Sequence, residues 1–124
     1  MSQQAVNRLA GLAMLVILLL AGSAARAAES VAFKFVLDID LGTSVTEGTV
    51  PVIGNRFAIS EITWFRRVDL SGAIDGDRIR VTGDWDGNYL SGECQAVHGQ
   101  CQLTFQTTGI IYSAFVSLSV HQRL

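Results

Sequence analysis

The sequence DWDGN places three oxygen-bearing side chains, Asp84, Asp86 and Asn88, at alternate positions around one glycine. Such side chains could ligate calcium, and a pair of carboxylates could act as general acid and base. An EF-hand loop beginning at Asp84 would need glycine at its sixth position and glutamate at its twelfth, where Tyr89 and Gln95 stand. We therefore expect neither a metal site nor a cofactor, and interpret these acids as solvated groups beside a turn.

Histidines offer little more for catalysis. His98 falls in a predicted turn and His121 lies near the C-terminus. No nucleophile elbow, zinc-protease motif, paired-cysteine redox motif or phosphate-binding loop is present. We expect no catalytic residues, and the alternative is a small enzyme that uses acidic residues such as Asp84 and Asp86.

The two cysteines, Cys94 and Cys101, are interpreted as one disulfide, because an even count in an exported chain favours pairing. A zinc site formed with His98 would lack a fourth nearby ligand. If the cysteines lie directly opposite one another, residues 96–99 form a four-residue hairpin loop, and the bond would fix its register.

An aromatic and cationic cluster is the best candidate for a ligand or partner surface. Trp64 and Phe65 precede Arg66 and Arg67, and guanidinium groups stack on rings and pair with carboxylates. The alternative is that an aromatic ring is core and the arginines neutralise nearby acids. Two further aromatic residues flank the DWDGN turn and complete the candidate surface: Trp85 and Tyr89.

Strands must position these residues, since hydrophobicity alternates with a period of two along most of the chain after residue 28. In the first such segment the apolar row runs from Val31 to Leu41, and a turn is expected at residues 42–44. Later segments are separated by glycines, and LSGAIDGDRI resembles VTGDWDGNYL eleven residues further on. This spacing is typical of consecutive hairpins in an antiparallel meander.

Apolar matching across the hairpins predicts their register. With a two-residue turn at 76–77, Ile74 faces Ile79; with one at 87–88, Trp85 faces Leu90. Asp-Gly is the stronger turn signal by itself, but it would place Trp85 opposite a polar residue. The preferred register sets two inner-face glycines, Gly83 and Gly92, opposite one another, under a large ring or beside a gap for a ligand.

The C-terminal third has no charged residue between Glu93 and Arg123. Its polar row is rich in glutamine, and an apolar row is expected to begin at Tyr112 and include Ala114 and Val116. Such strands are hazardous at an exposed edge. They are expected to be central or closed into a barrel, to pair with another chain, or to face lipid in an outer-membrane barrel.

The first 27 residues predict a secretory signal peptide: a positive start with Arg8, a short apolar run and a small-residue exit ending at Ala27. Ser23 stands where a lipidated cysteine would have to be, so lipid anchoring is not expected. Residues 28–124 then form one domain in which acidic residues exceed basic ones. That charge argues against nucleic acid or an anionic membrane surface as the main partner.

We therefore expect a single all-β domain of about seven or eight antiparallel strands, as a small up-and-down barrel, with a β-sandwich as the alternative. The expected location is the periplasm or the extracellular space, with membrane contact only through the signal peptide during export. The expected function is non-catalytic: a binding or accessory module for a small ligand or a protein. The alternative is a structural protein that self-associates through its C-terminal strands. The sequence does not identify the partner or the oligomeric state.

Overall fold

The computed structural model describes residues 28–122, and these form antiparallel strands. The predicted signal peptide lies outside the described residues. Residues 28–122 contain no helix long and apolar enough to cross a membrane. The strands are β2 (Ala28–Ile39), β3 (Gly42–Pro51), β4 (Arg56–Thr63), β5 (Arg66–Asp75), β6 (Arg78–Trp85), β7 (Asn88–Gln95), β8 (Gln100–Thr104), β9 (Gln106–Thr107) and β10 (Ser113–Gln122).

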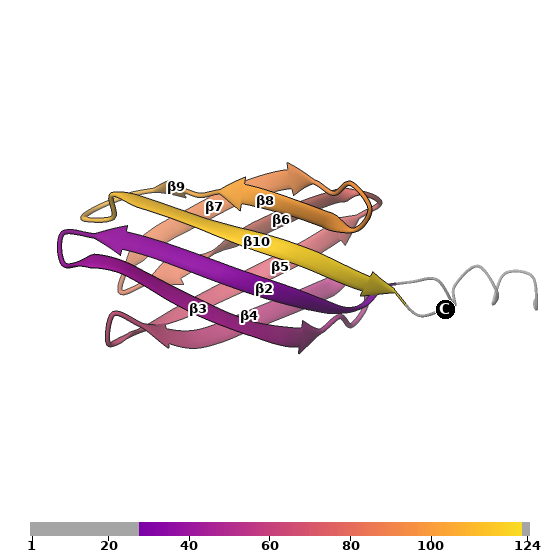
Figure 1. The fold of residues 1–124 in the computed structure, drawn as a ribbon, viewed down its shortest axis with the longest axis horizontal. Helices are drawn as coiled ribbons and strands as arrows, with labels where there is room; N and C mark the ends of the chain where they lie inside the picture. Colours follow the sequence, from indigo (N-terminus) through magenta and orange to yellow (C-terminus); the bar gives the residue numbers. More distant parts are fainter. Residues whose placement is uncertain (1–27, 123–124) are drawn as a thin grey trace, which may run out of the picture. The chain divides into compact units, whose positions relative to one another are not determined.

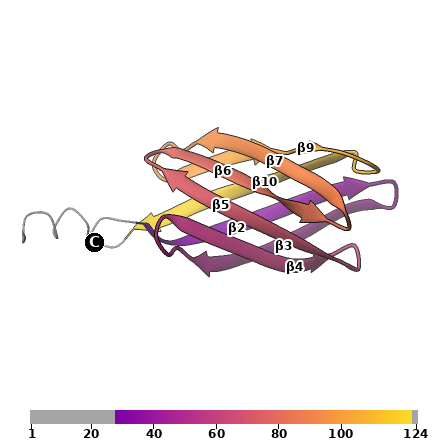
Figure 2. The ribbon, with the colours of Figure 1, turned by 180° about the vertical axis from the view of Figure 1, so that it is seen from behind.

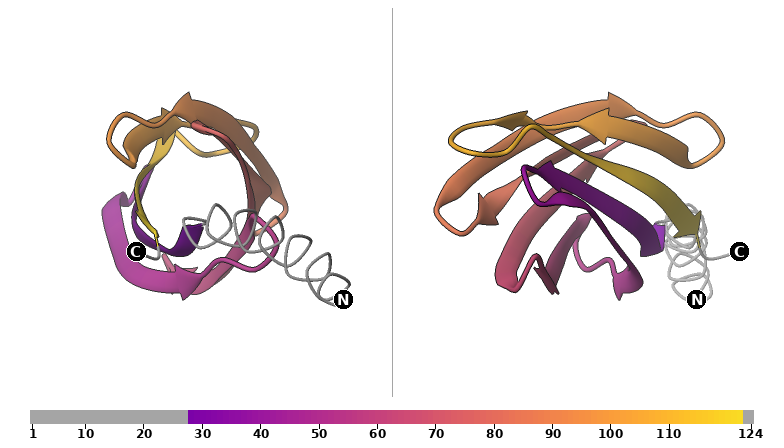
Figure 3. Two further views of the ribbon diagram at one scale, coloured as in Figure 1. Left: turned by 90° about the vertical axis from the view of Figure 1, so that its right-hand side faces the viewer. Right: turned by 60° about the vertical axis from the view of Figure 1, so that its left-hand side comes forward.

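The strands follow one another around a ring (Figures 1 and 2). One sheet has the order β3-β2-β10-β8 and the other the order β4-β5-β6-β7-β9. Strands β8 and β9 are separated only by Phe105, so this segment joins the two sheets, with β8 on β10 and β9 on β7. Viewed along its length, the domain is a barrel (Figure 3). The predicted all-β meander is confirmed.

One seam remains in the ring, between β3 and β4, which belong to different sheets. At one end of this seam the Thr63 hydroxyl donates a hydrogen bond to the Ser44 hydroxyl at 2.9 Å. Thr63 is 2% exposed, and its carbonyl accepts a hydrogen bond from the Trp85 indole at 2.8 Å. These bonds give the hydroxyl and the carbonyl of the buried Thr63 hydrogen-bond partners.

Inward-facing apolar side chains from both sheets fill the interior. The expected alternation places Phe33, Phe35 and Leu37 of β2 inside, and Trp85 of β6 is only 3% exposed. An antiparallel barrel of about eight strands is just wide enough for its own side chains to fill it. The core cluster comprises Val31, Phe33, Phe35, Leu37, Ile39, Phe57, Ile59, Val68, Leu70, Ile79, Val81, Trp85, Leu90, Leu103, Phe105, Ile111, Ala114, Val116 and Leu118.

The predicted register is confirmed in one hairpin and wrong in the next. Ile74 pairs with Ile79 across the turn at 76–77, as expected. Trp85, however, pairs with Asn88, two residues away from the predicted register with Leu90. The turn residues are Asp86 and Gly87, with φ angles of 50° and 82°. The tight Asp-Gly turn outweighs apolar matching, and because the shift is by two residues every side chain keeps its predicted face.

The same shift overturns the expected glycine pair. Gly83 lies opposite Leu90, and Gly92 lies opposite Val81. A β-carbon on Gly83 would collide with the backbone carbonyl of Asp69, and one on Gly92 would lie 2.9 Å from the Leu103 side chain. Neither glycine lies under an aromatic ring, and Gly92 lines a shallow surface pocket of about 430 Å³ beside Arg80 and Glu93. Both permit close approach of neighbouring strands.

Two turns also differ from the sequence-based expectation. The first turn is at residues 40–41, and Gly42 already begins β3, so the turn predicted at 42–44 is wrong. Cys94 and Cys101 form the expected disulfide, with Cα atoms 6.0 Å apart. The hairpin tip is tighter than predicted, because Val97 pairs with Gln100 and leaves only two residues in the turn. Short two-residue turns are favoured because their twist matches that of the strands.

The uncharged C-terminal strands lie within the ring, with β10 between β2 and β8. Ala114 and Val116 are fully buried, as their row predicted. Tyr112 is 68% exposed and therefore does not belong to that row. It precedes β10 and lies in the connection from β9, where the period-two pattern no longer applies.

Candidate functional site

The acidic residues of DWDGN do not form one site. The Asp84 carboxylate accepts a hydrogen bond from the Gly87 amide at 3.3 Å, and Asp86 pairs with Arg66 at 3.7 Å. The Asn88 amide donates to the Trp85 carbonyl at 3.0 Å. Asp84 and Asn88 therefore support the turn, and Asp86 links it to the first residue of β5. Among residues 28–122, no three histidine, cysteine or acidic side chains gather closely enough to hold a metal ion.

Four connections between strands meet at the end of the barrel away from Ala28 and Gln122, on the left in Figure 1. We call this the loop end. It comprises residues 40–41, 64–65, 86–87 and 108–112, which join β2 to β3, β4 to β5, β6 to β7 and β9 to β10. In an up-and-down meander, alternate connections must lie at the same end, so the topology itself brings them together.

Apolar side chains project from three of these four connections. Phe65 is 88% exposed, Leu41 69%, Tyr112 68% and Ile110 60%. We call these four residues the apolar rim. Single exposed apolar residues are ordinary on protein surfaces, but a group at one end of a domain is typical of an interaction surface. The opposite end, at the connections 52–55, 76–77 and 96–99, exposes Ile53 and Val97.

Hydrogen bonds and close packing link the four connections to one another. The Trp64 indole donates to the Leu37 carbonyl at 3.2 Å, and its ring packs beside Gly42. The Tyr112 amide donates to the Asp38 carbonyl at 2.9 Å. On the other side, the Tyr89 amide donates to the hydroxyl of Thr108, in the connection from β9, at 3.3 Å. The apolar rim is therefore held by a preformed framework.

The turn that presents Phe65 has a strained backbone. Trp64 and Phe65 are the two central residues of the hairpin between β4 and β5, with φ angles of 50° and 64°. Glycine, asparagine and aspartate are the residues favoured in such turns, and a bulky residue there is an outlier. Trp64 has a structural reason to be there, because its ring is partly buried against the core. Phe65 has no such packing.

The charged groups of the loop end are mainly acidic. Asp38 and Asp40 lie at the first connection, and Asp84 and Asp86 at the third. Arg66 is the cation at this end, and it is shared with Asp86. The next arginine along the strand pairs with Asp69 instead, at 3.1 Å.

Asp69 itself lies on the outer face of the middle of β5. The Ser60 hydroxyl, which donates to its carboxylate at 2.8 Å, and then the Arg67 guanidinium hold the pKa of Asp69 below its ordinary value. These contacts join β4 to β5 on the surface. They explain why Arg67 points along the sheet and is not available to the loop end.

The predicted surface residues thus separate into three groups. Trp64, Arg66 and Tyr89 lie at the loop end, and Tyr89 is 54% exposed. Arg67 belongs to the β4–β5 face, and Trp85 is buried in the core. Sequence reasoning missed Leu41, Ile110 and Tyr112. Their signal was weak: each is an apolar residue within two or three positions of a turn glycine, where strand periodicity had been extended too far.

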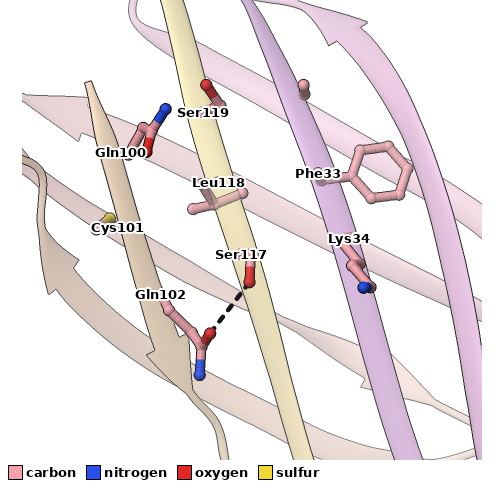
Figure 4. Close-up of a pocket in the computed structure, with 9 residues that line it drawn as sticks. Phe33, Lys34, Gln100, Cys101, Gln102, Ser117, Leu118 and Ser119 are labelled. Carbon is pink, nitrogen blue, oxygen red and sulfur yellow. Dashed lines mark hydrogen bonds between the residues drawn. The ribbon is translucent and has the colours of Figure 1, made fainter. Parts of the chain in front are cut away.

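A second surface feature is a shallow groove of about 520 Å³ on the outer face of β2, β8 and β10 (Figure 4). Lys34 is the charged residue among those lining it, and the Ser117 hydroxyl donates to the Gln102 amide oxygen at 3.2 Å. Its polar groups thus bond partly to one another. The residues that line it are Ala32, Phe33, Lys34, Gln100, Cys101, Gln102, Ser117, Leu118 and Ser119.

Comparisons of the chain with protein-family models, with curated proteins and with solved structures found no match. Functional inference therefore rests on the geometry of the loop end and the groove. The alternatives of self-association through the C-terminal strands and of an enzyme using acidic residues stay predictions. The disulfide is compatible with an extracellular or periplasmic location.

Proposed function

We propose that this protein is an exported, non-catalytic binding module whose contact surface is the loop end of the barrel. The observation that carries the proposal is Phe65, which is 88% exposed on a turn with a left-handed backbone. A strained backbone with an exposed aromatic ring is unfavourable for the folded domain alone. Strain of this kind persists where the surrounding structure enforces it, and it clusters at functional sites.

Two further features support a binding role. The apolar rim extends beyond Phe65 to Leu41, Ile110 and Tyr112, and the framework bonds hold its connections in place. A preorganised surface loses less conformational entropy on binding than a mobile one. Exposed aromatic side chains supply contact area with few rotatable bonds, and for that reason they are enriched at interfaces.

Site-specific photo-crosslinking in the native host tests this proposal. A photoreactive phenylalanine analogue replaces Phe65 in one variant and Ile53, which is 77% exposed at the opposite end, in the matched control. We expect a discrete crosslinked product from position 65 and none from position 53. No product from position 65, or equal products from both positions, would contradict a binding surface at the loop end.

A further inference from the structure

We infer that the partner of the loop end is a protein surface with an apolar centre and a border of lysine and arginine side chains. This inference rests on the proposed function and assigns the chemistry of its partner. Two properties of the loop end carry it: the size of the apolar rim and the sign of the surrounding charge.

The apolar rim has the size of an interface centre. Four side chains that are each at least 60% exposed present roughly 500 Å² of apolar surface, taking about 150–200 Å² for a fully exposed side chain. A stable protein interface buries roughly 800 Å² on each partner. The rim therefore accounts for the centre of such an interface, and the polar groups around it supply the remainder.

The acidic groups select the class of partner. Asp40 precedes Leu41 in the same two-residue connection, and Asp86 stands in the connection next to the one that carries Phe65, where it pairs with Arg66. Insertion of Leu41 and Phe65 into a bilayer would carry these carboxylates toward the hydrocarbon, where charged groups are unfavourable. A negatively charged lipid surface would also repel them.

A second copy of this chain is disfavoured for the same reason. Two loop ends placed face to face would bring two sets of acidic groups together, with Arg66 already paired to Asp86 in each; the acidic groups are Asp38, Asp40, Asp84 and Asp86. Like charges placed opposite each other across an interface are unfavourable. A partner with cationic groups around an apolar patch instead offsets this negative charge while it covers the rim.

The test uses defined synthetic peptides and the oxidised domain labelled with ¹⁵N. The first probe is a twelve-residue peptide with the repeat Lys-Leu-Ser. The second replaces each lysine with glutamate, and the third replaces each leucine with serine. Amide shift changes locate the contact, and titration gives the affinity. We expect shifts confined to the loop end with the first peptide, and affinity at least about tenfold weaker with the other two.

Variants of the protein sharpen the result. Phe65→Asn removes the ring at a turn position that asparagine tolerates, and should abolish the shifts without unfolding the domain. Asp40→Asn should weaken the lysine peptide about twofold to fivefold, as expected for one exposed ion pair, and 0.5 M salt should weaken it further. The control Ile53→Asn should leave the affinity unchanged.

Three outcomes would overturn the inferred partner class. Equal affinities for the glutamate and lysine peptides would show that charge does not select the partner, and would refute the inferred partner class. Stronger binding to phosphatidylcholine vesicles than to any peptide would assign the rim to a lipid surface. Sedimentation showing a dimer that Phe65→Asn dissociates would assign it to a second copy. Crosslinking at position 65 combined with any of these results keeps the proposed function and rejects only this partner.

Discussion

Replacement of Phe65 should stabilise the domain, although it removes a large apolar side chain. The residue sits at φ 64° and is 88% exposed, so the ring contributes little burial while the β-carbon is strained. A left-handed backbone costs an L-residue about 1–2 kcal/mol. Glycine avoids this strain but raises the entropy of the unfolded chain by about 0.5–1 kcal/mol. We expect Phe65→Gly to gain about 0.5–1 kcal/mol, and Phe65→Asn about 1 kcal/mol.

Thermal and urea unfolding of the oxidised domain measure this change, and each kcal/mol should raise Tm by about 4–8 °C. Phe65→Ala is the matched control, because it removes the ring but keeps the β-carbon; its stability should stay within about 0.5 kcal/mol of the parent. Gly87→Ala is the converse test, because it adds a β-carbon at a position with φ 82°, and it should lower the free energy of unfolding by about 1 kcal/mol. If glycine and asparagine at position 65 prove no more stable than alanine, the assignment of strain to this turn is refuted.

Other predictions concern the scaffold. Replacing Cys94 and Cys101 with alanine should lower the free energy of unfolding by about 2–3 kcal/mol for the short loop that they close, measured by urea unfolding; no change would show that the bond does not constrain the unfolded chain. Gly83→Ala should destabilise by about 1–3 kcal/mol or more, because its β-carbon meets the Asp69 carbonyl, whereas Ser60→Ala should lose less than about 1 kcal/mol. Ser60→Ala should also raise the pKa of Asp69, followed by NMR titration of its carboxyl. Because that pKa is lowered in the folded state, the contribution of Asp69 to stability is present above the unfolded pKa and is lost as pH falls through the folded value; a pKa unchanged by Ser60→Ala would contradict the assigned cause.

Faces of strands could be predicted from the sequence because side chains alternate with a period of two whatever the register. Trp85 and Leu90 are buried as expected, even though the predicted pairing between them was wrong by two residues. Register depends on the backbone energy of the turn: the Asp-Gly signal gives the right register for the turn at 86–87, whereas apolar matching gives it for the turn at 76–77. The alternation of hydrophobic residues says nothing of that energy.

The loop end could be predicted only in part. Trp64, Arg66 and Tyr89 were identified because aromatic and cationic residues stand out in a sequence. The period-two pattern predicts that Leu41 faces the core, because it lies two residues after Ile39. It predicts the same for Tyr112, which lies two residues before Ala114. Whether an apolar residue at the end of a strand lies inside or outside depends on where the chain turns. These residues gather at one end because alternate connections of an up-and-down meander lie at the same end of the barrel.

The position of β10 between β2 and β8 has a consequence for the order in which the domain assembles. Strands β4, β5 and β6 pair only with their neighbours in the chain, so their contacts close short loops and form early. The sheet that contains β2 joins the first described strand to the last, and this long closure must wait until β10 has been synthesised. Until then β2 and β8 lack their shared neighbour, and a partly made chain exposes two uncovered strand edges.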